Sequence, residues 1–102
     1  MTTCSTHVLD AALGAPAAGL AVTLSGAEVA LSATTDDDGR ITWPGDLVPG
    51  TYELTFATGS WFGAAERETF YPEIHLVVDL GGPHAHVALL LSPFSYTTYK
   101  GS

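Results

Sequence analysis

The side chains that can do chemistry in this chain of 102 residues are few: four histidines, three cations and one cysteine. Two segments of alternating polar and apolar residues, STHVLD at 5–10 and HAHVALLLS at 84–92, contain three of the histidines. Residues two apart on a strand share a face. The faces that carry the imidazoles are made by Ser5, His7 and Leu9 in the first segment and by His84, His86, Ala88 and Leu90 in the second. Each predicted strand therefore offers a histidine at its polar end.

A histidine of ordinary pKa, about 6.5, is largely neutral at physiological pH, so His7 and His86 are candidates for general acid–base chemistry. Arg40, which follows three aspartates and a glycine, is a candidate cation for an oxyanion. Each has a plainer interpretation. A single strand histidine is commonly structural, and Arg40 could pair with the preceding aspartates at the surface.

Two other kinds of site find less support. His84 and His86 would project from one face roughly 6–7 Å apart, near enough to share a metal ion. A zinc site needs at least a third ligand, and no spacing shows that His7 or His75 supplies it, so we predict no metal site. Cys4 has no neighbouring basic group to activate it, which favours a small apolar role, buried or half-buried.

The composition limits the classes of partner that the protein can bind. Three cations against eleven carboxylates give a formal net charge of −8, which disfavours nucleic acid and anionic membranes. The longest apolar run, 87–91, is the length of a strand and not of a membrane span. One cysteine cannot form an internal disulfide, and residues 1–10 show no basic segment followed by an apolar one. We therefore expect a cytoplasmic protein.

The elements that must position these residues are short strands. Runs of β character recur about every ten residues, separated by Gly, Pro and Asp-Gly turns, which is typical of an all-β sandwich in a single domain, residues 1–102. The expected strands are 4–10, 20–25, 28–35, 40–43, 51–57, 73–80, 84–92 and 95–99. Asp38-Gly39 predicts a tight hairpin turn. Residues 59–70 predict a helix of two turns at most, with Ser60 as its cap.

Several of these segments resemble the transthyretin-like family, and within it the branch that hydrolyses 5-hydroxyisourate in urate degradation. The resemblance runs along nearly the whole chain. Its most specific parts are STHVLD, HAHVALLLSPFSYTTY and the final Tyr-Lys-Gly-Ser. It implies a Greek-key β-sandwich of seven to eight short strands with one short helix. It also implies a homotetramer of sandwiches paired edge to edge and then face to face, with active sites in the channel between dimers.

The resemblance also implies roles for individual residues. His7, Arg40 and His86 match the catalytic residues of these hydrolases. The last four residues match a tetrapeptide that lines the active site, supplied by a neighbouring subunit, with Tyr99 touching the substrate. These residues are Tyr99, Lys100, Gly101 and Ser102. Lys100 stands where the family usually has arginine, which replaces a planar fork of donors by one flexible charge.

The implied reaction is the ring-opening hydrolysis of a cyclic amide by water that the histidines activate, with no cofactor. Two other interpretations stay open. A non-catalytic carrier of the same family would bind a small aromatic ligand in the channel, with His86 and Arg40 as polar anchors. An all-β interaction module with structural histidines would have no channel and a dispensable tail.

Overall fold

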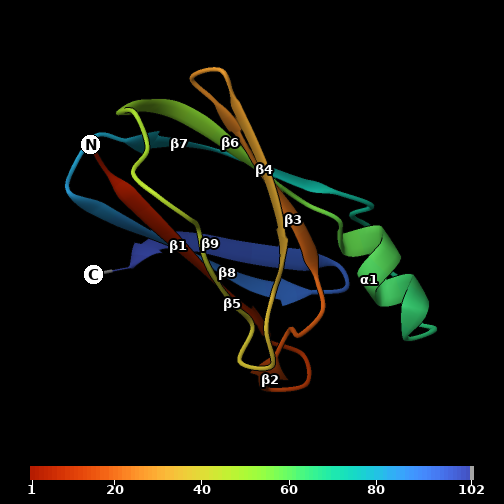
Figure 1. Ribbon diagram of the computed structural model, residues 1–102. Helices are drawn as coiled ribbons and strands as arrows, with labels where there is room; N and C mark the ends of the chain where they lie inside the picture. The colour runs from red at the N-terminus through yellow and green to blue at the C-terminus, as the bar shows by residue number, and fades with distance from the viewer. Residues whose placement is uncertain (102) are drawn as a thin grey trace.

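The computed structural model describes residues 1–101, which form two facing β-sheets and one short helix (Figure 1). One sheet has the order β4-β3-β6-β7. The other has the order β2-β1-β8-β9, with β5 also paired to β1. The elements are β1 (Thr3–Asp10), β2 (Ala15–Pro16), β3 (Ala21–Gly26), β4 (Val29–Thr34), β5 (Arg40–Thr42), β6 (Gly50–Phe56), α1 (Thr58–Ala64), β7 (Ile74–Leu80), β8 (His84–Ser92) and β9 (Ser95–Gly101).

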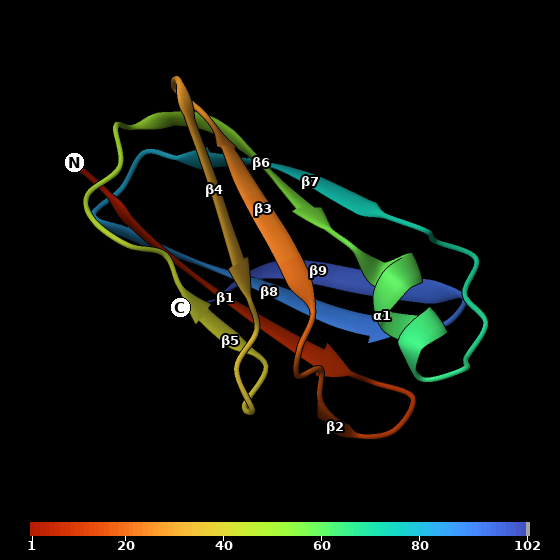
Figure 2. The ribbon, with the colours of Figure 1, turned by 45° about the vertical axis from the view of Figure 1, so that its right-hand side comes forward.

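The predicted strands are all present, with ends that differ by at most two residues, and the all-β sandwich is confirmed. The two-residue strand β2 was not predicted, because a segment of two residues carries no alternation. Both ends of the chain lie at the end of the sandwich opposite α1 (Figures 1 and 2). Within the described residues no helix has the length and apolar character that crossing a membrane requires.

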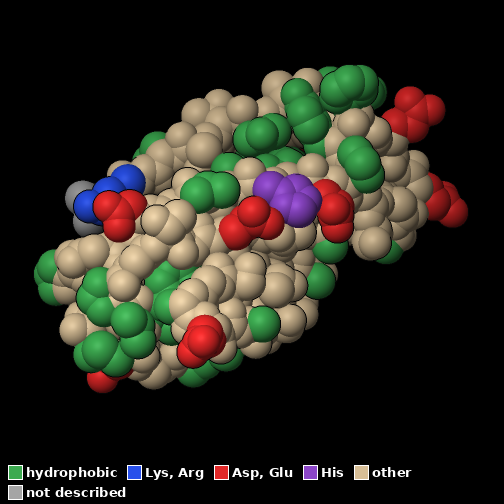
Figure 3. All heavy atoms as spheres, turned by 90° about the horizontal axis from the view of Figure 1, so that it is seen from above, with side chains coloured by type: hydrophobic (Ala, Val, Ile, Leu, Met, Phe, Trp, Pro, Cys, Tyr) green, Lys and Arg blue, Asp and Glu red, His purple; other side chains and the backbone are tan. Residues whose placement is uncertain are grey.

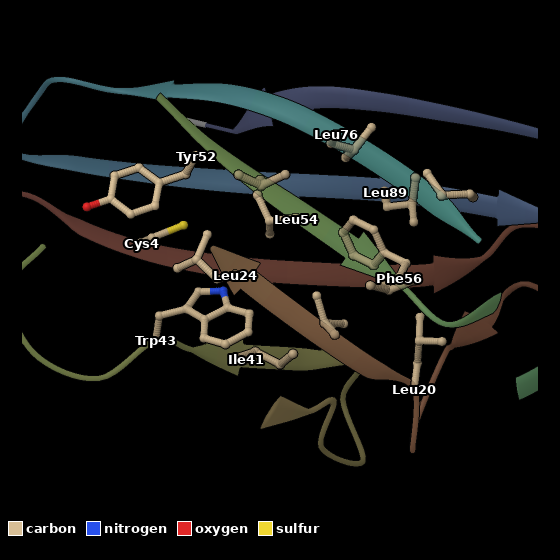
Figure 4. Packing of buried hydrophobic residues seen from close by; sticks show 14 of the residues in the cluster. Cys4, Leu20, Leu24, Ile41, Trp43, Tyr52, Leu54, Phe56, Leu76 and Leu89 are labelled. Carbon is tan, nitrogen blue, oxygen red and sulfur yellow. The ribbon is translucent and has the colours of Figure 1, made fainter. Parts of the chain in front are cut away.

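The core lies between the two sheets, as strand alternation requires (Figure 4). In β1 every second residue, beginning with Cys4, is buried. Full burial of a large apolar side chain contributes roughly 1.5–3 kcal/mol. The largest side chains with almost no exposed surface include Tyr52, Phe56, Phe62, Leu54 and Leu89. The inward residues thus hold the sheets together, and the outward residues of β1 and β8 are left for other roles.

The pairing of β1 with β8 decides which outward residues meet. These strands run parallel, and the register places Ser5 beside His86 and His7 beside Ala88. On its other side, β1 pairs antiparallel with β5, so that His7 lies beside Arg40. Trp43, buried just after β5, donates a hydrogen bond from Nε1 to Thr6 Oγ1 at 3.0 Å. This bond anchors β5 to β1 from the core side.

Two local predictions are corrected. Ser60 lies inside α1 and does not cap it; the N-cap is Ala57, with no side-chain hydrogen bond. The helix begins where Thr58 is buried and donates from its hydroxyl to the Tyr71 carbonyl at 2.6 Å, so a tertiary contact overrides local propensity. Asp38-Gly39 forms a tight turn but not the turn of a paired hairpin, because β4 and β5 belong to different sheets.

Candidate active site

His7, Arg40 and His86 lie together on the outer face of three adjacent strands. Strand β1 is central, with β5 and β8 on either side, and the registers place Arg40 beside His7 and Ser5 beside His86. The imidazole centroids of His7 and His86 are 6.3 Å apart, with the ring planes at 48°. Two histidines and a guanidinium that are far apart in sequence therefore share one small area of surface.

The turn at 36–40 positions both Arg40 and a carbonyl group next to His7. Asp36 Oδ1 accepts the backbone N–H groups of Asp38 and Arg40, both at 2.9 Å. Gly39 has φ +76°, and a Cβ there would lie 2.3 Å from the Val8 carbonyl oxygen. The Val8 N–H in turn donates to the Gly39 carbonyl at 2.8 Å. Only glycine allows this close approach to β1.

The ring of His7 is held by the same turn. Its Nε2 lies 3.0 Å from the Asp38 carbonyl oxygen. A carbonyl only accepts, so Nε2 carries a proton and donates it to that bond. The other ring nitrogen, Nδ1, makes no side-chain hydrogen bond with the described residues.

His86 is held from the opposite nitrogen. Its Nδ1 lies 2.7 Å from Ser5 Oγ. Partial burial, followed by electrostatic interaction with His7, Arg40 and His84, lowers the pKa of His86 below its ordinary value. A lowered pKa keeps this imidazole neutral at physiological pH, which is the form that accepts a proton.

The guanidinium of Arg40 is exposed and forms no ion pair with residues 1–101. The surface pairing with the preceding aspartates that the sequence left open is therefore not what the structure shows. Asp36 instead uses its carboxylate on backbone N–H groups. Arg40 is left to bind an anionic or carbonyl oxygen beside the two histidines.

Strand β9 brings the tail to this face of the sandwich. It runs antiparallel to β8, with Tyr99 beside Ala88 and Gly101 beside His86. The backbone at Gly101 packs against the His86 ring. Tyr99 is half exposed, at 53%, so its phenol is open to a ligand. The predicted role of Ser102 lies outside the described residues.

Lys100 is the predicted residue that the structure does not bring to the others. Its register partner is Val87, which is buried on the core side of β8. Neighbouring residues on a strand point to opposite faces, so Lys100 and Tyr99 diverge. Lys100 lines a groove of about 450 Å³ between the edges of β7 and β9, to which Tyr99 also contributes. Within this chain the position of Lys100 does not support a role in substrate binding.

The remaining candidate groups of the sequence, Cys4 and His75, lie away from this face. Cys4 is buried in the core, and burial raises the pKa of its thiol to about 11, which confirms its apolar role. His75 lies on the other sheet, between Glu53 at 2.9 Å and Glu73 at 3.1 Å. That face shows a histidine flanked by acidic side chains (Figure 3). Among residues 1–101 no three metal-binding side chains are grouped suitably for an ion.

Ser5 and His84 lie near the candidate site but were not predicted to belong to it. Ser5 contacts both His84 and His86, with Oγ at 3.2 Å from His84 Nε2. Alternation placed Ser5, His84 and His86 on outward faces, but the contact depends on the register between β1 and β8. No local sequence signal reports the pairing of strands that are 80 residues apart.

A model of the HIUase/Transthyretin family matches residues 4–101. The chain belongs to this family. Membership of the HIUase/Transthyretin family agrees with the arrangement described above, in which the family resemblance and the strand registers select the same three residues.

Relatives within the HIUase/Transthyretin family include named hydrolases. The 5-hydroxyisourate hydrolase of Mus musculus is 41% identical over 96% of this chain and 93% of its own length. That of Salmonella dublin is 40% identical over 96% of this chain and 79% of its own. The structure of Klebsiella pneumoniae 5-hydroxyisourate hydrolase is similar over the full length of both chains, with 38% identity and a TM-score of 0.93. Sea bream transthyretin, solved with thyroxine, has 29% identity and a TM-score of 0.87.

Proposed function

We propose that the chain is an enzyme that hydrolyses 5-hydroxyisourate by opening its ring at a cyclic amide. The observation that carries the proposal is the meeting of His7, Arg40 and His86 on one sheet face. Relatives of about 40% identity that carry the name of this hydrolase support it. The substrate is a small oxidised purine of urate degradation, and no cofactor is called for.

The chemistry that this face can perform follows from its groups. Hydrolysis of an amide needs a base for water, stabilisation of the oxyanion and a proton for the leaving nitrogen. The two imidazoles supply proton transfer, and such catalysis typically contributes about 10²–10⁴-fold. Arg40 is the cross-strand partner of His7, and its guanidinium would offset the charge that develops on a substrate oxygen between the histidines. Tyr99 offers a phenol that can orient the ring of the substrate by a hydrogen bond.

We also propose that four such subunits assemble, with this face lining a channel between dimers. The support is the family membership and the exposed side chains of β9. In a tetramer, a neighbouring subunit would cover Tyr99 and exclude water from the site, which strengthens each electrostatic interaction there. The single, buried Cys4 fits a reducing, cytoplasmic setting.

A non-catalytic carrier is the second candidate, and the likeness to a transthyretin solved with thyroxine is the observation that favours it. An ultraviolet assay on freshly generated 5-hydroxyisourate separates the two. The proposed enzyme accelerates the loss of the substrate absorbance well above the spontaneous rate. A carrier binds the compound and leaves that rate unchanged, which would overturn the proposal.

A further inference from the structure

A chain of polar contacts runs along the outer face of β1 and β8 and ends at His86. Ser5 Oγ lies 2.7 Å from His86 Nδ1 and 3.2 Å from His84 Nε2. Farther along, His84 Nδ1 lies 2.6 Å from Thr3 Oγ1. The parallel register, in which Thr3 lies beside His84 and Ser5 beside His86, produces this alternation of hydroxyl and imidazole.

The direction that we assign to the hydrogen bonds of this chain starts from the hydroxyl of Thr3. The Thr3 hydroxyl is 3.4 Å from the Pro83 carbonyl oxygen, which can only accept. The hydroxyl carries one proton and has a second neighbour in His84 Nδ1 at 2.6 Å. In the direction that we assign, Thr3 donates to Pro83 and its oxygen accepts from the Nδ1–H of His84. Neutral His84 then has its lone pair on Nε2, so it accepts the hydroxyl proton of Ser5.

The last bond follows from the same reasoning. Because Ser5 donates to His84, its oxygen accepts from the Nδ1–H of His86. Neutral His86 then carries its lone pair on Nε2, which makes no side-chain hydrogen bond with the described residues. A neutral histidine has one donor and one acceptor nitrogen, so each partner in the chain selects the tautomer of the next.

We propose that Ser5 and His84 are positioning residues that hold neutral His86 in the Nδ1–H tautomer, with Nε2 free as the base for water. The proposal rests on the proposed function, and it divides the roles of the two histidines. His7 is held in the opposite tautomer, since its Nε2–H donates to the Asp38 carbonyl at 3.0 Å. The two rings thus present different nitrogens to a substrate.

His86 Nε2 can carry out both proton transfers that the reaction requires. The Nε2 lone pair takes a proton from water while the water oxygen bonds to the ring carbonyl carbon. The carbon–nitrogen bond then breaks, and the leaving nitrogen receives the proton from Nε2–H. The bond from Nδ1–H to Ser5 is the same in the neutral and charged rings, so the imidazole need not turn between the two steps.

The surroundings of His86 favour this role. The charged or titratable groups that face it are His7 on β1, Arg40 on β5 and His84 on β8, and none is a carboxylate among residues 1–101. The Arg40 guanidinium disfavours the charged imidazole and helps return it to the neutral base after each turnover.

The first test reads the tautomers directly, by ¹⁵N NMR of the imidazoles in the intact protein at a pH where they are neutral. We expect Nδ1–H signals for His84 and His86 and an Nε2–H signal for His7. In Ser5→Ala, His86 loses the partner of Nδ1 and its tautomer shifts toward Nε2–H. An Nε2–H tautomer for His86 in the unaltered protein would overturn the proposal. This readout needs no substrate, so it stands even if the proposed function fails.

The second test is kinetic and uses the unaltered chain with matched variants. Ser5→Ala lowers kcat about 10–100-fold, while KM changes much less. This is the range known for the loss of a hydrogen-bond partner that orients a metal-binding histidine. Ser5→Thr, which keeps a hydroxyl, recovers most of kcat. Thr42→Ala is the control, because Thr42 lies beside Ser5 on β5 without a side-chain hydrogen bond to the described residues.

His84→Ala guards against a variant of Ser5 that fails to fold, since His84 is exposed in the subunit. It leaves the Ser5 hydroxyl free to donate to His86 instead, so kcat falls and the acid limb of its pH profile moves. An unchanged kcat and an unchanged pH profile in both Ser5→Ala and His84→Ala would overturn the positioning role. The positioning role would also be overturned if, of these variants and His86→Ala, only His86→Ala lost activity.

Discussion

Gly101 and His86 are cross-strand partners, and only a residue without a side chain fits between β9 and the imidazole. A Cβ atom at position 101 would lie 2.5 Å from Cδ2 and 3.1 Å from Cγ of His86. Contacts that short require something to shift. The end of the chain is therefore built against the ring that we propose as the base, and it is an ordered strand as far as Gly101.

Replacing Gly101 tests this contact. In Gly101→Ala we expect the ring of His86 or the end of β9 to move, and kcat to fall about 10–100-fold because a small misplacement of a catalytic group is costly. Gly82→Ala is the matched control, since nothing lies within 4 Å of a Cβ there. Thermal unfolding monitored by circular dichroism should change little in either variant. Equal activity in both variants would show that the contact does not matter.

We expect His7 and His86, but not His75, to be needed for activity. His7→Ala and His86→Ala should each lower kcat/KM about 10²–10⁴-fold for 5-hydroxyisourate, the usual contribution of acid–base catalysis. His75→Ala, on the opposite sheet, should retain full activity. Ultraviolet kinetics measures the rates, and size-exclusion chromatography with light scattering checks assembly. Full activity in His7→Ala or His86→Ala would remove that residue from the site.

The activity should fall in acid with a midpoint that His86 determines. Burial and the neighbouring positive groups lower the pKa of His86 below its ordinary value of about 6.5. The base acts in its neutral form, so kcat is retained above the lowered pKa and is lost as the pH falls through it. A profile of kcat against pH gives the midpoint. An acid limb centred well above 6.5 would contradict the assignment.

The ion pair of Asp10 and Arg67 should govern acid stability. Burial raises the pKa of Asp10. The Arg67 hydrogen bond at 2.6 Å and the N–H groups of Leu13 and Ala12 together lower this pKa by more, so that the net shift is downward. Its contribution is therefore present above the unfolded pKa, about 3.9, and is lost as the pH falls through the folded value.

Removing the cation at neutral pH tests the same pair by another route. Arg67→Ala leaves the buried Asp10 carboxylate without its partner and removes the guanidinium that lies 4.8 Å from the Phe62 ring. We expect a loss of about 3 kcal/mol in unfolding free energy, at the lower end for broken buried pairs because Arg67 is partly exposed. Urea unfolding at pH 7 measures it. A midpoint equal to that of the unaltered chain would contradict the prediction.

Tyr99 and Lys100 are neighbours that the strand sends to opposite faces, and they should behave differently. Tyr99→Phe removes the hydrogen bond to the substrate that we propose for this phenol, worth about 0.5–1.5 kcal/mol, and should raise KM a few-fold or more. Lys100→Ala should leave KM within about twofold, since its side chain lies over the groove beside β7. Steady-state kinetics on both variants decides. A larger effect at Lys100 would favour a contact across subunits.

Much of the fold was predictable because alternation is a local property. The segment at 84–92 was expected as a strand and is β8 with the same bounds. The helix was expected near 59–70 and is present as α1, but its start was misplaced. Ser60 is a good cap by type, while the actual start depends on the burial of Thr58 against the Tyr71 carbonyl, which no local pattern records.

The sequence by itself determined the all-β class and, through its resemblance to a family, the candidates His7, Arg40 and His86. It did so because side-chain period and motif residues can be read along the chain. Only the tertiary structure decided that Ser5 touches both His84 and His86, that Lys100 points away, and that Gly101 lies on an imidazole. Those facts depend on the register between strands distant in sequence, and register is set by packing of the whole sandwich.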